Sequence, residues 1–217
     1  MLKWTSLGLT IAATAIIATP VAAQQANPAW NGFYAGLNAG GMFGSTSANF
    51  AGPAGPGGFS GNGGGFVGGA QAGYSYLFGA VLLGGELDFQ GSTYAAGLNG
   101  GAGPGPVNAT ERMPWFSTMR LRAGYTVGSW MPYVTGGAVW GQRTIDGGGP
   151  GTPFMSASNT YWTWTVGGGV EAMLANRWSA KLEYLYMGTP STSLAPGINS
   201  SESTSSNLFR IGVNYHF

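Results

Sequence analysis

Residues 207–217 read NLFRIGVNYHF, and this stretch decides the fold class. Apolar residues occupy every second position, as Phe209, Ile211, Val213, Tyr215 and Phe217. The residues between them are Arg210, Gly212, Asn214 and His216. Because successive side chains of a β-strand point to opposite faces, the stretch is predicted to be a strand with one apolar and one polar side. In a membrane barrel, the apolar side of such a strand faces lipid and the polar side faces the lumen.

Similar alternation recurs along the chain, so the sequence predicts eight strands in total. They cover residues 30–43, 64–78, 81–93, 115–127, 131–143, 160–174, 178–187 and 207–217. In the fifth of these strands, the adjacent Gly136 and Gly137 interrupt the alternation. The sequence therefore leaves open which face of residues 131–143 points outward.

The predicted connections between the strands alternate between long loops and short turns. Four long stretches rich in Gly, Pro, Ser and Asn are predicted to be loops, at residues 44–63, 94–114, 144–159 and 188–206. Three short turns are predicted at residues 79–80, 128–129 and 175–177. Short periplasmic turns with long outer loops are typical of outer-membrane barrels. We therefore predict an all-β fold, an eight-stranded antiparallel up-and-down transmembrane β-barrel.

Outward aromatic residues give the expected height of the membrane band. Phe33 and Phe43 lie ten residues apart, and so do Trp115 and Tyr125. Ten residues of a tilted strand cover about 24 Å along the membrane normal, which is the spacing of the two aromatic girdles of such barrels. The predicted girdle residues are Phe33, Phe43, Trp115, Tyr125, Trp162 and Trp178.

Residues 1–23 are predicted to be a secretory signal peptide. Lys3 precedes an apolar run over residues 7–18, and the small residues that end at Ala23 suit cleavage after that position. The apolar run is too short to span a bilayer as a helix, and no later stretch offers about 18 uninterrupted apolar residues. We expect residues 24–29 to form a short periplasmic segment and residues 30–217 to form a barrel in the bacterial outer membrane.

The composition argues against several other classes of protein. Removing Lys3 with the signal peptide leaves equal numbers of basic and acidic residues, so no basic surface for nucleic acid is expected. There is no cysteine, hence no disulfide. His216 is the only histidine, so the sequence predicts neither a metal cluster nor a catalytic Ser-His-acid set, and we expect no cofactor.

Charged residues make up only 7% of the chain, and the alternation places most of them inside the predicted barrel. The inward set holds four acidic and four basic residues: Glu86, Asp88, Glu171, Glu183, Arg120, Arg122, Lys181 and Arg210. With a three-residue turn after Leu174, Glu171 would sit opposite Lys181; with a turn at residues 79–80, Gly73 would sit across from Glu86. Because an unpaired buried charge costs several kcal/mol, this balance predicts an internal network of ion pairs.

Such a network has two interpretations. An eight-stranded barrel has an interior just wide enough for side chains to fill, which favours a polar plug that makes the barrel rigid. Alternatively, the charges could line a narrow hydrated path and set its selectivity. The sequence alone does not decide between the two.

The order of short motifs adds a family resemblance that covers almost all of residues 30–217. The motifs are WNGFYAG (30–36), GAQAGYSY (69–76), GGELDFQGS (84–92), STMRLRAGYTV (117–127), PYVTGGAVWG (132–141), VGGGVE, WSAKLEYLY and the closing LFRIGVNYHF. They resemble the small alphaproteobacterial outer-membrane porin-like family, within the OmpA-type barrels. Tyr215 and Phe217 resemble the terminal assembly signal of such barrels, which implies the barrel-assembly machinery as a partner during insertion.

The resemblance implies a non-enzymatic protein that contributes to envelope integrity, and outer-membrane lipids as its surroundings. We expect a monomer. One alternative function is that of a small-solute porin with a narrow charged lumen, and another is binding of a ligand or surface through the outer loops. A soluble secreted barrel is a third alternative, against which the outward aromatic residues argue.

Overall fold

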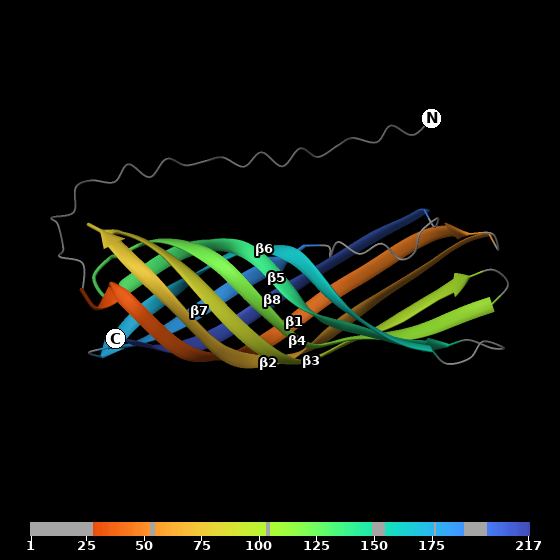
Figure 1. The fold of residues 1–217 in the computed structure, drawn as a ribbon, viewed down its shortest axis with the longest axis horizontal. Coiled ribbons are helices and arrows are strands. Elements are labelled where there is room, and N and C mark those ends of the chain that lie inside the picture. The colour runs from red at the N-terminus through yellow and green to blue at the C-terminus, as the bar shows by residue number, and fades with distance from the viewer. Residues whose placement is uncertain (1–27, 53–54, 103–104, 149–154, 176, 189–198) are drawn as a thin grey trace, which may run out of the picture.

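The computed structural model describes residues 28–52, 55–102, 105–148, 155–175, 177–188 and 199–217. The predicted signal peptide and residues 24–27 lie outside these ranges. After a short 3₁₀ turn, η1 (Pro28–Trp30), eight antiparallel strands close into a barrel in sequence order (Figure 1). The strands are β1 (Gly32–Gly52), β2 (Gly55–Phe78), β3 (Val81–Ala102), β4 (Gly105–Tyr125), β5 (Trp130–Gly148), β6 (Met155–Ala175), β7 (Trp178–Met187) and β8 (Asn199–His216). The predicted fold class is confirmed.

Short turns join the strands at the end of the barrel that carries the C-terminus (Figure 1). Gly79 has a φ of 65° and Gly128 a φ of 59°, a backbone region that residues with a Cβ rarely adopt. These glycines allow the chain to reverse within a few residues, as the sequence predicts. Pairing of β8 with β1, which includes Tyr215 opposite Ala35, closes the barrel.

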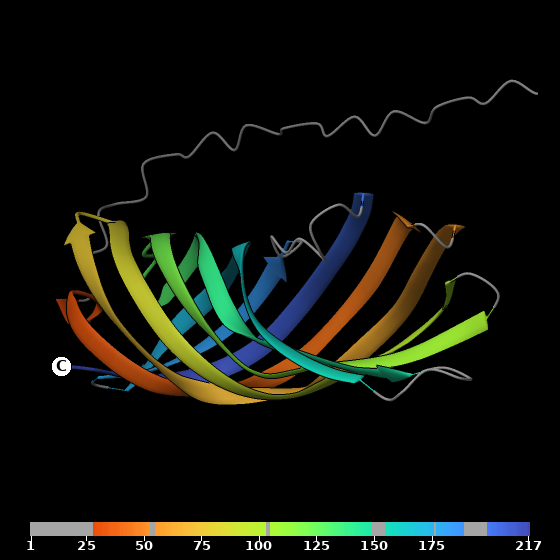
Figure 2. The same ribbon diagram turned by 45° about the vertical axis from the view of Figure 1, so that its right-hand side comes forward.

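The strands extend much further than predicted at the opposite end. Residues 44–63, 94–114 and 144–159 were predicted to be loops, and for most of these residues the prediction is wrong. β1 pairs with β2 as far as Gly52 and Gly55, and β3 pairs with β4 as far as Ala102 and Gly105. Gly, Ser, Asn and Ala side chains are too small to show an apolar alternation, yet their backbones complete the same ladders. These long hairpins project away from the C-terminal end of the barrel (Figure 2). Of the fourth predicted loop, residues 189–198 lie outside the described ranges.

The side chains of the strands divide cleanly between the two faces. The outer face carries exposed apolar side chains such as Leu37, Leu121 and Ile211, each more than 60% exposed. The structure also settles the orientation of β5: Trp130 and Val134 point outward, whereas Met131 and Tyr133 are buried in the lumen. No helix in the described ranges is long and apolar enough to cross a membrane.

Trp30 departs from the prediction that it begins the first strand. It lies in η1, and β1 starts only at Gly32. Its side chain is 1% exposed and meets the ring of His216 edge-on, with 5.4 Å between ring centroids. The turn before β1 thus folds Trp30 into the periplasmic end of the lumen.

Candidate functional site

The candidate site is the charged lumen. All eight charged residues that the sequence places inside the barrel are at most 4% exposed. They project from β3, β4, β6, β7 and β8 toward the axis and meet near the middle of the barrel. The structure therefore holds a buried ion-pair network, with equal numbers of acidic and basic members.

Glu86 lies at the centre of this network. Its two carboxylate oxygens are 3.0 and 3.1 Å from Nζ of Lys181. Arg120 also donates to Glu86, and Nη1 of Arg122 lies 3.2 Å from Oε2. The hydroxyl of Tyr34 donates to the same Oε2 at 2.8 Å. Nη2 of Arg210 lies 3.6 Å from Oε1, so one carboxylate faces four cations, and the excess positive charge must be neutralised elsewhere in the network.

Two further carboxylates provide this neutralisation. Asp88 Oδ2 accepts from Arg120 at 3.0 Å and from Nη2 of Arg210 at 2.8 Å. Glu183 accepts from Nη1 of Arg120 at 3.0 Å and from Nε of Arg210 at 2.6 Å. The two guanidinium groups are therefore each shared between Asp88 and Glu183. Shared, charge-assisted hydrogen bonds of this kind fix the geometry of both partners.

Glu171 lies nearer the periplasmic end and binds Arg122, which also contacts Glu86. Its Oε2 accepts from Nη2 of Arg122 at 2.6 Å, and its Oε1 accepts from Ser179 at 2.5 Å and from Asn214 at 2.6 Å. The guanidinium of Arg122 also lies over the ring of Tyr133, 4.1 Å from its centroid. A planar cation against an aromatic face gains a further electrostatic attraction.

The ion pairs do not simply follow the strand register. Glu171 and Lys181 are cross-strand partners, as predicted, but their charged groups form no ion pair among the described residues. Lys181 instead extends across the lumen to Glu86, and Glu171 binds Arg122. In a narrow barrel, side chains that point toward the axis come close to residues on the opposite wall.

Small residues make room for this network. Gly73 is the register partner of both Tyr34 and Glu86, as the predicted turn at residues 79–80 requires for Glu86. A Cβ at this glycine would overlap the phenol ring of Tyr34. Gly73 therefore leaves the space in which the Tyr34 hydroxyl reaches Glu86.

Apolar layers cover the network at both ends. On the outer side, Met42, Phe116, Val139, Leu185 and Leu208 belong to one buried cluster, and each is at most 1% exposed. On the periplasmic side, a second buried cluster is formed by Trp30, Leu82, Met131, Tyr133 and Met173. The charges are thus enclosed between two hydrophobic layers.

A second buried ion pair, between Glu111 and Arg143, lies beyond the outer apolar layer. The alternation in the sequence did not predict this pair. Nη2 of Arg143 donates to Oε2 of Glu111 at 3.0 Å, and Nε of the same guanidinium lies 2.9 Å from Oε1. Glu111 falls in the stretch predicted to be a loop. The register of β4 also shifts between Arg112 and Trp115, so Met113 and Phe116 both face inward and the simple alternation breaks there. This pair lines a small cavity of about 10 Å³, close to the room that one water molecule needs.

Ser179, His216 and Glu171 come together at the periplasmic end but do not form a catalytic triad. Nε2 of His216 lies 2.9 Å from the Ser179 hydroxyl and 3.6 Å from Oε1 of Glu171, so the same ring nitrogen faces both residues. A triad needs the acid on the other nitrogen of the imidazole. No group of three or more metal-ligating side chains occurs in the described part of the chain.

The remaining predicted residues lie on the outer face. The predicted girdle residues Phe33, Phe43, Tyr125, Trp162 and Trp178 are each more than half exposed. Trp115 is partly covered, because it stacks on Phe89 and donates to Gln142 at 3.0 Å. Tyr215 and Phe217 continue from Trp178 as a row of edge-on rings with centroids 5.2 Å apart.

A protein family matches this architecture. The family model described as outer membrane protein beta-barrel domain matches residues 9–217. This chain belongs to that family. It is 36% identical over 211 residues to the 31 kDa outer-membrane immunogenic proteins of Brucella melitensis and Brucella suis, covering 91% of this chain and 88% of the relatives. The family and these relatives show that the protein is located in the bacterial outer membrane.

Two more distant similarities were found. The 22 kDa outer membrane protein of Rhizobium leguminosarum is 27% identical over 162 residues, which cover 72% of this chain and 63% of that protein. The crystal structure of the outer membrane protein OprG from Pseudomonas aeruginosa superposes with a TM-score of 0.49 at 14% identity, over 86% of this chain and 96% of that one.

Proposed function

We propose that this protein is a structural, non-enzymatic component of the outer membrane whose lumen is a closed plug. The observation that carries the proposal is the enclosure of the ion-pair network between two apolar layers. An ion that passed would have to cross both apolar layers and displace cations from their carboxylates. Each such step removes a charge from its partner in a dry interior, which is costly.

The plug also explains how the network contributes to envelope integrity. Hydrogen bonds between Arg120, Asp88 and Glu183 join β3, β4 and β7 across the barrel axis. Arg210 adds β8 to the same set. Cross-bracing of this kind resists flattening of the barrel, because flattening would separate buried charges.

A narrow hydrated path is the second candidate function. Gln90 is fully buried, and neither polar atom of its side-chain amide has a hydrogen-bond partner in the described part of the chain. Oδ1 of Asp88 likewise has none. Buried polar atoms are nearly always satisfied by protein or by water, so these atoms favour some internal hydration.

Ion conductance of the mature barrel in a planar bilayer distinguishes the two candidates. We expect no unitary current steps from the folded protein, with folding verified by its gel shift on heating. Phe116→Ala, which thins the outer apolar layer, serves as a positive comparison and is expected to leak more than the parent. Stable steps from the parent whose selectivity changes in Arg120→Glu would instead establish a porin.

We further propose that the barrel is a monomer surrounded by outer-membrane lipids. The assembly machinery recognises its terminal residues Tyr215 and Phe217. Both aromatic side chains lie at the end of β8, next to the closing pairs with β1. Replacing Phe217 with Ser should reduce the amount of barrel in the outer membrane without changing the stability of the refolded protein.

The outer hairpins are the candidate surface for binding other molecules. Their outward residues are polar and small, such as Ser47, Asn62 and Asn99, and they are exposed. The Brucella relatives are named as immunogenic, which fits an accessible outer end. Deleting residues 51–58 tests this role: a ligand or antibody that binds equally well afterwards does not use the β1–β2 hairpin.

A further inference from the structure

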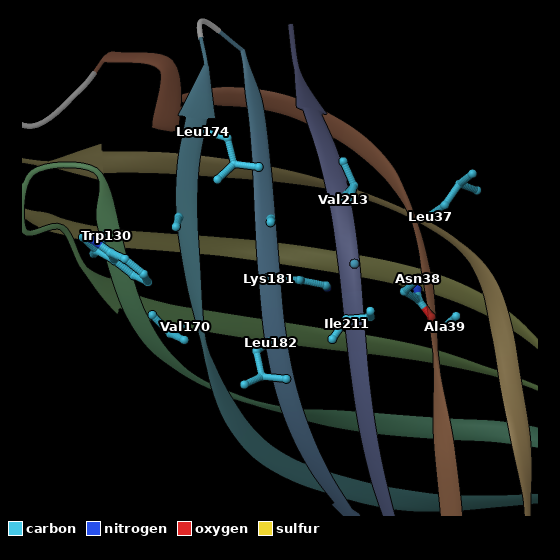
Figure 3. Close-up of a pocket in the computed structure, with 13 residues that line it drawn as sticks. Leu37, Asn38, Ala39, Trp130, Val170, Leu174, Lys181, Leu182, Ile211 and Val213 are labelled. Atoms are coloured by element: carbon cyan, nitrogen blue, oxygen red, sulfur yellow. The ribbon is translucent and has the colours of Figure 1, made fainter.

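The lipid-facing side of the barrel carries a hollow of about 810 Å³ near its periplasmic end. It extends over β6, β7, β8 and β1 (Figure 3), where Leu174, Leu182, Val213 and Leu37 mark its edges. Apart from Asn38, Lys181 and Gly212, its lining is apolar. It lies outside the charged lumen: Asn38 and Lys181 are buried and direct their polar groups inward, whereas apolar side chains such as Leu37, Leu182 and Ile211 point away from the axis.

The hollow exists because two small residues face each other. Ala172 on β6 is the register partner of Ala180 on β7, and both belong to its lining. Trp130 on β5 is the other neighbour of Ala172 and is 58% exposed. Larger side chains therefore surround a shallow base formed by the two alanines. This shape suits a flexible hydrocarbon chain that lies against the barrel.

An exposed cation, Arg177, lies beyond the periplasmic edge of this hollow. Arg177 sits in the turn between β6 and β7, three residues after Leu174, and is exposed. Its backbone carbonyl accepts a hydrogen bond from His216 N at 2.8 Å, which ties the turn to the end of β8. Its guanidinium makes no ion pair or hydrogen bond with any described residue.

We propose that this hollow binds one anionic phospholipid of the periplasmic leaflet. An acyl chain lies on Ala172 and Ala180, and the phosphate lies at the guanidinium of Arg177. The exposed ring of Trp178, between Arg177 and Ala180 in the sequence, stands at the level that aromatic residues favour, between the acyl chains and the headgroups. Arginine is well suited to the phosphate, because its planar fork matches two phosphate oxygens.

A lipid fills this surface better than a second copy of the chain. A two-fold dimer would place the same patch of each copy face to face, so hollow would meet hollow. Two concave surfaces leave a void, whereas an acyl chain adapts to the shape. The hollow is also continuous with the rest of the lipid-facing surface of an outer-membrane barrel.

Native mass spectrometry of the detergent-solubilised mature barrel tests the proposal, with dioleoylphosphatidylglycerol and dioleoylphosphatidylcholine as probes. We expect one retained phosphatidylglycerol and about fivefold weaker retention of phosphatidylcholine, since one basic residue near an anionic headgroup is worth this much. Arg177→Gln should abolish the preference. Ala180→Phe should reduce retention of both lipids by filling the hollow.

Matched variants control for general effects. Arg112→Gln removes another exposed arginine, at the far end of the barrel, and Ala123→Phe enlarges an outward alanine on β4, away from the hollow. Both should retain lipid like the parent.

Equal retention of the two lipids by the parent, or an Arg177→Gln effect without an Ala180→Phe effect, would overturn the proposal. So would a dimer that Ala180→Phe dissociates. If Ala180→Phe fails to show the gel shift of a folded barrel, Ala172→Leu replaces it.

Discussion

At the scale of single residues, the choice of partner by Lys181 shows how the lumen is organised. Lys181 is 3% exposed, so its buried ammonium group needs an opposite charge close by. The neighbouring strand offers Glu171, but the opposite wall offers Glu86, and the structure uses Glu86. Pairing across the lumen joins strands that are far apart around the barrel.

Double-mutant cycles test this choice. The cycle of Glu86→Gln with Lys181→Met should give a coupling of about 2 kcal/mol, as for residues in direct contact, and the cycle of Glu171→Gln with Lys181→Met a clearly smaller one. The free energy of unfolding would be measured by tryptophan fluorescence in urea, with the barrel in lipid vesicles. Larger coupling to Glu171 would show that the ion pairs follow the strand register after all.

An exposed ion pair provides the matching control. Arg112 and Asp146 lie 3.5 Å apart near the outer end, and the arginine side chain is 62% exposed. Solvent-exposed pairs contribute about 0–1 kcal/mol. A cycle of Arg112→Gln with Asp146→Asn should therefore show almost no coupling in the same assay.

At the scale of strands, glycines on the lumen face let neighbouring backbones approach closely. Gly40 lies between the buried Asn38 and Met42 on β1, opposite Arg210 on β8. A Cβ at Gly40 would overlap the backbone carbonyl oxygen of Phe209. The long side chain of Arg210 thus leaves the wall at a point where the facing strand contributes only backbone.

Alanine substitution measures how much this close approach matters. Gly40→Ala should destabilise the barrel by about 1–3 kcal/mol, because the overlap is with backbone and the strands must separate. Gly85→Ala should be close to neutral, since its nearest neighbour would be the Arg120 carbonyl oxygen at 3.9 Å. Equal effects in urea unfolding would mean that the strands adjust freely at Gly40.

At the scale of the whole molecule, the barrel wall continues beyond the membrane band. On the outer face of β1, the exposed Phe43 is followed by the polar Ser45 and Ser47. β7, by contrast, ends at Met187, while β6 and β8 continue past it. The described wall is therefore lowest at β7, close to the small cavity beside Glu111 and Arg143.

Cysteine accessibility locates the membrane on this surface. The chain has no cysteine, so single substitutions report without background. In intact cells, Ser47→Cys should react with a membrane-impermeant maleimide, whereas Ala39→Cys on the same face of the same strand should not. Both positions are exposed on the barrel, so only lipid distinguishes them. Equal labelling would place the membrane band elsewhere along β1.

The sequence by itself determined the type of barrel and most of its inner surface. Alternation of apolar and polar residues assigned faces to seven strands, and short turns such as residues 79–80 set the register that places Gly73 beside Glu86. These features are local, because a strand has a period of two and a tight turn leaves little freedom in register. The eight lumen charges could be named for the same reason.

Three features were decided only by the tertiary structure. Closure of the barrel determines which charges meet across the axis, as for Lys181 and Glu86. The register shift in β4 turns Glu111 inward against the simple alternation. Strand pairing continues through Gly- and Ser-rich segments whose side chains carry no pattern. In each case the cause is a contact between residues that are distant in sequence. The alternation of side chains along a single strand carries no information about such contacts.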